Sequence, residues 1–121
     1  MIYYKRLIFK VYDELIPISP DSIVCCKADD DWSVISLTGN KEVQINEPVS
    51  VIIKKLPYQH FLRVHKDWIV NVLYIDKVFW EINHIRMIDG VEIELLPMMK
   101  FRLERLLLQN PIFCRELEWM E

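Results

Sequence analysis

Glycine is almost absent from this chain, which has only two glycines in 121 residues. A loop that cradles the phosphates of a nucleotide needs several glycines, because its backbone must approach the phosphate closely. The sequence also lacks the Cys-x-x-Cys and His-x-x-x-His spacings that are typical of zinc sites. We therefore expect no catalytic activity, no metal site and no cofactor.

Long apolar runs are absent as well. The longest useful one, residues 68–75, is far shorter than the roughly 20 residues of a membrane-spanning helix. The first ten residues are interrupted by charges and lack the apolar core of a signal peptide. We expect a cytoplasmic protein with no membrane partner.

Cysteine is scarce, and the three residues present do not form a pairing pattern. Cys25 and Cys26 are neighbours on a predicted strand, so their side chains should point to opposite faces of the sheet. Two such thiols cannot form a disulfide without strain. We expect all three cysteines to be reduced.

Short alternating segments fill most of the chain, whose length suits one compact domain. Only two segments, near residues 46–56 and 97–109, have helical periodicity. We therefore expect an α+β, mostly β domain over residues 1–110 and a short C-terminal extension at 111–121. The predicted strands are 6–11, 15–18, 23–27, 32–37, 42–45, 61–64, 75–82, 85–87 and 91–95.

Local signals place the helices and the turns between strands. Asn46 is a candidate N-cap for the first helix, which Pro57 ends. Pro97 suits the first position of the second helix, whose apolar stripe includes Leu103 and Leu107. The dipeptide Asp89-Gly90 predicts a two-residue type I′ hairpin, and residues 28–31 form a predicted acidic loop.

A basic segment stands out in a chain whose formal net charge is −3. Residues 48–66 contain four basic side chains and no acid: Lys54, Lys55, Arg63 and Lys66. A local basic segment on an acidic protein indicates an anionic partner.

The same region continues into residues 61–71, which read Phe-Leu-Arg-Val-His-Lys-Asp-Trp-Ile-Val-Asn. This segment resembles the signature of the LytTR family, which usually reads Phe-x-Arg-x-His-Arg-Ser-Tyr-x-Val-Asn. The opening hairpin, residues 21–24, Leu56-Pro57 and the Asp-Gly hairpin fit the family too. The resemblance implies an elongated arrangement of small antiparallel sheets with two short helices, in which loops enter the major groove of DNA.

Three DNA-contacting loops of that family can be carried over to this chain. In the signature loop, Lys66 matches the contacting position after the histidine and can meet a phosphate or a guanine edge. Arg63 is a candidate for a phosphate contact, and His65 is either a structural imidazole or a DNA contact. Asp67 replaces the usual serine and places an acid near phosphate.

The other two loops depart further from the family pattern. The first covers residues 29–32, where the candidates for a DNA contact are Asp31 and Trp32. Trp32 is either a packing residue or a platform on which a base stacks. The third usually carries Ser-Arg where this chain has Leu96-Pro97. Lys100 and Arg102 lie close by and either substitute for the arginine or form the solvated face of a helix.

These features predict a stand-alone, bacterial, response regulator-like transcriptional regulator that binds specific double-stranded DNA, with a homodimer as a possible form. The alternative is a LytTR-fold protein-protein interaction module with reduced or lost DNA binding and a regulatory protein partner. The acidic first loop and the apolar residues Phe113 and Trp119 of the extension support this alternative. We expect the extension to mediate packing or self-association, since these rings would otherwise be exposed.

Overall fold

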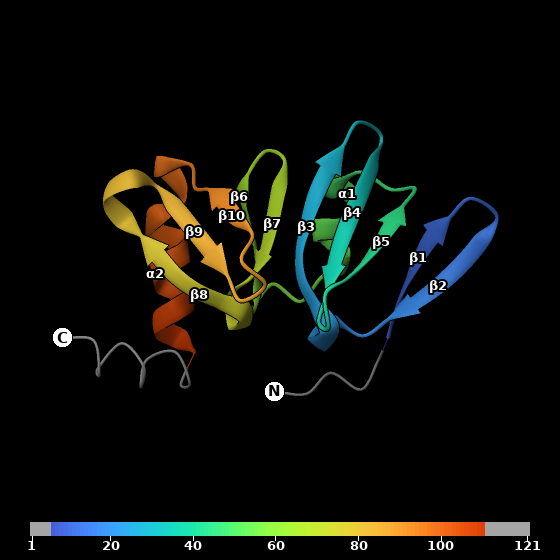
Figure 1. Ribbon diagram of the computed structural model, residues 1–121, viewed down its shortest axis with the longest axis horizontal. Helices are drawn as coiled ribbons and strands as arrows, with labels where there is room; N and C mark the ends of the chain where they lie inside the picture. The colour runs from blue at the N-terminus through green and yellow to red at the C-terminus, as the bar shows by residue number, and fades with distance from the viewer. Residues whose placement is uncertain (1–5, 111–121) are drawn as a thin grey trace.

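The computed structural model describes residues 6–110. Three antiparallel sheets and two helices make up this range (Figure 1). β1 (Leu7–Val11) and β2 (Glu14–Ile18) form a hairpin at one end. The five-stranded sheet contains, in spatial order, β5 (Lys41–Ile45), β4 (Trp32–Leu37), β3 (Ile23–Asp29), β7 (Trp68–Asn71) and β6 (Phe61–His65).

The remaining elements flank the five-stranded sheet. The third sheet is formed by β10 (Glu92–Glu94), β9 (His84–Met87) and β8 (Ile75–Phe79). The helices are α1 (Val49–Lys55) and α2 (Lys100–Gln109), and short 3-10 turns include η2 (Val72–Tyr74), η3 (Trp80–Ile82) and η4 (Pro97–Met99). The α+β, mostly β class is confirmed.

The five-stranded sheet separates two apolar cores. Cys26, Ile35 and Ile69 face the core that contains α1 and the β1–β2 hairpin. Cys25 and Val70 face the other core, which the three-stranded sheet and α2 close. Cys25 and Cys26 are both buried free thiols, and their opposite orientations confirm the expectation from the alternating strand.

The first helix forms as predicted, but its start differs. Asn46 does not cap it, because the Asn46 side-chain oxygen accepts a hydrogen bond from the backbone N–H of Tyr12. Pro48 occupies the N-cap position, without a side-chain cap. The Asn46 side chain therefore bonds to the β1–β2 hairpin, which is distant in sequence, instead of capping the helix that follows it.

Glu47 links the same hairpin to α1. Its buried carboxylate accepts hydrogen bonds from Lys10 N at 3.1 Å and Lys55 Nζ at 2.5 Å. Lys55 Nζ also donates to the Ile8 carbonyl at 3.0 Å. Since Asn46 N donates to the Lys10 carbonyl at 2.8 Å, the hairpin is attached through polar contacts as well as through its apolar side chains.

Asn71, the last residue of the signature segment, is buried inside the fold. Its Nδ2 donates to the Ile23 carbonyl at 2.9 Å, and its Oδ1 accepts from Leu73 N at 3.0 Å. Asn71 therefore caps η2 and ties the end of β7 to the start of β3.

Several predicted boundaries are wrong. The second helix was expected to start at Pro97, but Pro97 opens the 3-10 turn η4 and α2 begins at Lys100. The strand expected at 75–82 ends at Phe79 and continues as η3, which closes on Asn83 in the left-handed conformation with φ 54°. The acidic loop is shorter than expected, because β3 extends to Asp29 and leaves a turn of two residues.

A further error concerns the type of the Asp-Gly turn. Gly90 N donates to the Met87 carbonyl and Met87 N donates to the Val91 carbonyl, both at 2.9 Å. Of the two residues predicted to form the turn, only Gly90 has a positive φ, at 88°, whereas a type I′ turn needs two. The loop therefore has three residues, with Gly90 in a bulge. The packing expected for Phe113 and Trp119 lies outside the described residues.

Candidate nucleic-acid interface

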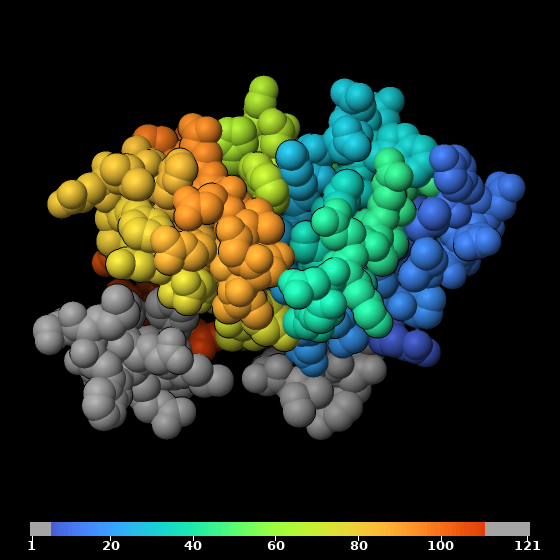
Figure 2. Space-filling view, in the orientation of Figure 1, coloured from blue at the N-terminus to red at the C-terminus, as the bar shows by residue number. Residues whose placement is uncertain are grey.

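Three segments that are far apart in sequence meet at one end of the five-stranded sheet. They are the β3–β4 turn (30–31), the β6–β7 turn (66–67) and residues 96–97 after β10, and we call them together the turn end (Figure 1). Ala28 N donates to the Asp67 carbonyl at 2.8 Å, and Leu96 N donates to the Val64 carbonyl at 3.0 Å. These two hydrogen bonds hold the segments side by side, and Figure 2 shows the first two projecting from the molecule.

Lys66 occupies the β6–β7 turn and is exposed. The Arg63 guanidinium donates from Nε, at 3.1 Å, and from Nη2 to the Lys66 carbonyl oxygen. Arg63 thus fixes the backbone from which Lys66 projects. The sequence pattern missed this positioning role, because alternation predicts the face of a side chain but not a bond across a turn.

His65 is held within the protein. Its Nδ1 accepts from Asp67 N at 3.2 Å, and its Nε2 lies 3.9 Å from a carboxylate oxygen of Glu94. The His65 side chain is only 18% exposed. Since Nδ1 accepts a hydrogen bond, a neutral ring carries its proton on Nε2. This arrangement favours the structural reading of His65 over a direct DNA contact.

The end of β3 and the β3–β4 turn present three exposed carboxylates, those of Asp29, Asp30 and Asp31. Asp30 adopts the left-handed conformation with φ 55°, which aspartate tolerates better than most residues. Trp32 is half-buried and packs edge-on against Tyr12, with ring centroids 5.0 Å apart. That contact supports a packing role for Trp32 rather than base stacking.

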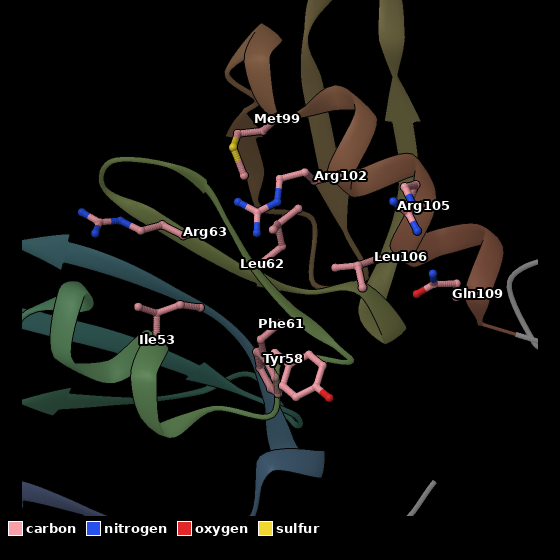
Figure 3. A pocket seen from close by; sticks show the side chains of 10 residues that line it. All are labelled: Ile53, Tyr58, Phe61, Leu62, Arg63, Met99, Arg102, Arg105, Leu106 and Gln109. Atoms are coloured by element: carbon pink, nitrogen blue, oxygen red, sulfur yellow. The ribbon is translucent and has the colours of Figure 1, made fainter.

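The third segment brings the start of α2 towards the turn end. Lys100 is half-buried and Arg102 is exposed. Figure 3 shows Arg102 reaching from α2 towards Leu62 on β6, so that Arg102 and Arg63 line one hollow. The structure therefore brings Arg63, Lys66 and Arg102 to the same part of the molecule.

Lys27 is a further cation at the turn end, and the sequence analysis did not name it as a candidate site residue. It is exposed on β3, pairs in register with Trp68 and places its ammonium 5.5 Å from the centroid of the Trp68 ring. Lys27 thus stands beside the β6–β7 turn. The turn end is mixed in charge, since Asp67 and the three aspartates at positions 29–31 lie beside these cations.

Among residues 6–110, no group of three or more His, Cys, Asp or Glu side chains is placed to hold a metal ion. No helix in that range is long and apolar enough to cross a membrane.

Two comparisons with known proteins give matches. A family model described as the LytTr DNA-binding domain matches residues 13–95, which include the first two turns of the turn end. One solved structure with a similar fold is the LytTr DNA-binding domain of a protein from Bacillus cereus described as a methyl-accepting/DNA response regulator. It has a TM-score of 0.70 and 18% identity, and the match covers 87% of this chain and 98% of that one. No curated protein sequence matches the chain.

Proposed function

Since the chain belongs to the LytTR family of DNA-binding domains, we propose that it is a stand-alone transcriptional regulator that binds specific double-stranded DNA sites. The observation that carries this proposal is the turn end, where backbone hydrogen bonds join three distant segments around the exposed Lys66. Residues 1–110 form the DNA-binding unit in this proposal, and residues 111–121 extend it. We propose no catalytic role.

In the proposed complex the β6–β7 turn enters the major groove. The Lys66 ammonium has three donors and can meet guanine O6 and N7 or a phosphate oxygen. Arg63 holds the turn in place, while Lys100 and Arg102 reach phosphates at the side of the groove. Two copies on neighbouring half-sites would each supply one Lys66, which suits a homodimer on paired sites.

A protein-interaction module is the second candidate function. The exposed aspartates at positions 29–31 favour it, because each carboxylate near a phosphate lowers DNA affinity. A selection from random oligonucleotides with the purified protein separates the two candidates. An enriched motif supports the regulator, and the absence of one supports the module.

Replacing Lys66 with alanine should weaken binding to a selected DNA site by about 1 to 3 kcal/mol if the lysine reads a base. If it meets a phosphate instead, binding to all sequences should weaken alike and the salt slope should fall by about one unit. Titrations at two salt concentrations distinguish these outcomes, and circular dichroism checks the fold.

Lys41→Ala is the matched control for this experiment. Lys41 is also exposed, but it pairs with Leu37 at the opposite end of β4 from the turn end. Its replacement changes the net charge equally and should leave specific binding nearly unchanged. A folded Lys66→Ala protein that binds like the Lys41→Ala control would contradict the proposed role of Lys66.

Replacing Asp29, Asp30 and Asp31 together with asparagine should strengthen DNA binding. The change removes repulsion of phosphate without adding a cation, so the gain should shrink as added salt screens the charges. Electrophoretic mobility or anisotropy titrations at low and high salt measure this gain. An unchanged affinity at low salt would place the β3–β4 turn away from the DNA.

A further inference from the structure

A groove runs between α1 and α2 across β6, which is an edge strand of the five-stranded sheet. Its volume is about 430 Å³. Apolar side chains form much of its lining, among them Phe61, Leu62 and Leu106, and Figure 3 shows them between the two helices. We call this hollow the edge groove.

Three arginines line the edge groove, namely Arg63, Arg102 and Arg105, and no acidic residue does. Within residues 6–110, neither Arg102 nor Arg105 has a carboxylate at ion-pair distance. Arg105 instead lies over the Phe101 ring, 5.7 Å from its centroid. An apolar floor with cations along it suits an extended segment that carries both apolar side chains and carboxylates.

The edge groove leads to the point where the described part of the chain ends. A second hollow, of about 240 Å³, shares Tyr58, Leu106 and Gln109 with the edge groove and also borders Asn110. Residues 111–121 follow directly from Asn110. A segment that leaves from there starts at the mouth of the groove.

The sequence of residues 111–121 complements both the positive charge and the apolar lining of the edge groove. It contains the acids Glu116, Glu118 and Glu121 against a single base, together with the apolar Ile112, Phe113 and Trp119. Eleven extended residues reach up to about 36 Å, whereas the ten residues of α2 span only about 15 Å. The segment is therefore long enough to run beside the whole of α2.

We propose that residues 111–121 fold back into the edge groove, with their carboxylates against Arg102 and Arg105 and their aromatic side chains over the apolar floor. The bound segment also covers Arg63. In so far as the proposed DNA binding holds, the segment acts as an autoinhibitory element, because it competes with phosphate for Arg102 and covers Arg63, which positions the β6–β7 turn.

A spin label on Cys114 of the full-length chain tests the position of the segment without DNA. Cys25 and Cys26 are buried, and burial raises the pKa of the Cys25 thiol to about 11, so both react slowly near neutral pH. A Cys114→Ser protein that takes up no label verifies the selectivity. The amide signals of Ile53 and Arg63, on the far side of the groove from α2, report the approach of the label by their broadening.

We expect both amide signals to be lost in the labelled parent and to return in labelled E116K/E118K, which keeps the same tether and the same label. R102E/R105E should release the segment too, and combining the two pairs of charge reversals should restore the broadening. Signals that stay sharp in the labelled parent, or that broaden equally in the parent and in E116K/E118K, would overturn the proposal. Circular dichroism on each variant confirms that it is folded.

DNA titration gives a separate readout for the competition. E116Q/E118Q should bind a selected site more tightly than the parent, and more tightly than E42Q/E81Q, which removes two exposed carboxylates elsewhere. Equal affinities for the two double variants would show that the segment does not compete. Failure of every protein to bind DNA would contradict the proposed function and leave the result with the spin label intact.

Discussion

Replacing Asn71 with alanine is expected to lower the free energy of unfolding by about 3 kcal/mol, the largest effect we predict for a single side chain. The Asn71 amide serves two backbone groups at once, the Ile23 carbonyl and the Leu73 N–H. Alanine leaves both without their partner in a buried place, and water cannot fully replace the amide there. The change should loosen the junction between β3 and β7, on which the turn end depends.

Urea denaturation followed by circular dichroism measures this effect. Asn71→Asp is informative beside it, since a carboxylate still accepts from Leu73 N but cannot donate to the Ile23 carbonyl, and should destabilise at least as much. Gln44→Ala, which removes an exposed amide from β5, is the matched control and should stay within about 0.5 kcal/mol of the parent. An Asn71→Ala protein as stable as this control would show that the two hydrogen bonds contribute little.

Replacing Glu47 with alanine should cost about 2 to 3 kcal/mol of unfolding free energy. Its carboxylate is the acceptor for both Lys10 N and Lys55 Nζ, and its side chain is only 10% exposed. Without it, Lys10 N loses its partner and the β1–β2 hairpin loses its ionic attachment to α1. Hydrogen exchange should therefore quicken first in β1 and β2.

A double-mutant cycle isolates the ion pair. Lys55→Met keeps an unbranched side chain against the Phe9 ring, over which the Lys55 ammonium now lies at 5.1 Å. We expect a coupling energy on the order of 1 kcal/mol between positions 47 and 55, since Lys55 is partly exposed and its charge is partly screened. Strictly additive effects would mean that Glu47 acts through Lys10 alone.

The sequence predicted the elements whose signals are local. The alternation from Trp32 to Leu37 predicted β4 at both of its ends, and the spacing in α1 predicted its buried face. The errors arose where contacts between distant residues decide the outcome. Asn46 is of a residue type that often caps helices, but its side chain bonds instead to Tyr12 in the turn of the β1–β2 hairpin.

The alternation of apolar and polar residues also gave a wrong prediction where it continued past the end of a strand. The apolar residues after Phe79 keep a strand-like pattern, yet the chain turns there as η3 and closes on Asn83. In the Asp-Gly hairpin, the dipeptide marked the correct place, but Ile88 joined the loop and changed its type. Turn type, loop length and strand register are set together, and a dipeptide alone does not fix them.

The sequence indicated which segments form the candidate site, but not the contacts that its side chains make. The resemblance to the family pointed to the three segments that meet at the turn end, and the structure places them together. The bond from Arg63 to the Lys66 carbonyl and the internal contacts of His65 could not be read from spacing, since each depends on the shape of the β6–β7 turn. Lys27 was missed because its place beside the β6–β7 turn follows from the pairing of β3 with β7, which spacing along the chain does not show.

The pairing of β3 with β7 sets the distance between the two hairpin turns at the turn end. Neighbouring strands lie about 4.8 Å apart, so the centres of the β3–β4 and β6–β7 turns are separated by two such intervals, roughly 10 Å. Successive base pairs rise by about 3.4 Å, so in the proposed complex a groove that runs along both turns would meet them about three base pairs apart. One base pair inserted between those positions would shift the second contact by about 3.4 Å and about a tenth of a helical turn. A hydrogen-bonded sheet cannot stretch to follow that shift, so strand spacing would set the spacing within a half-site.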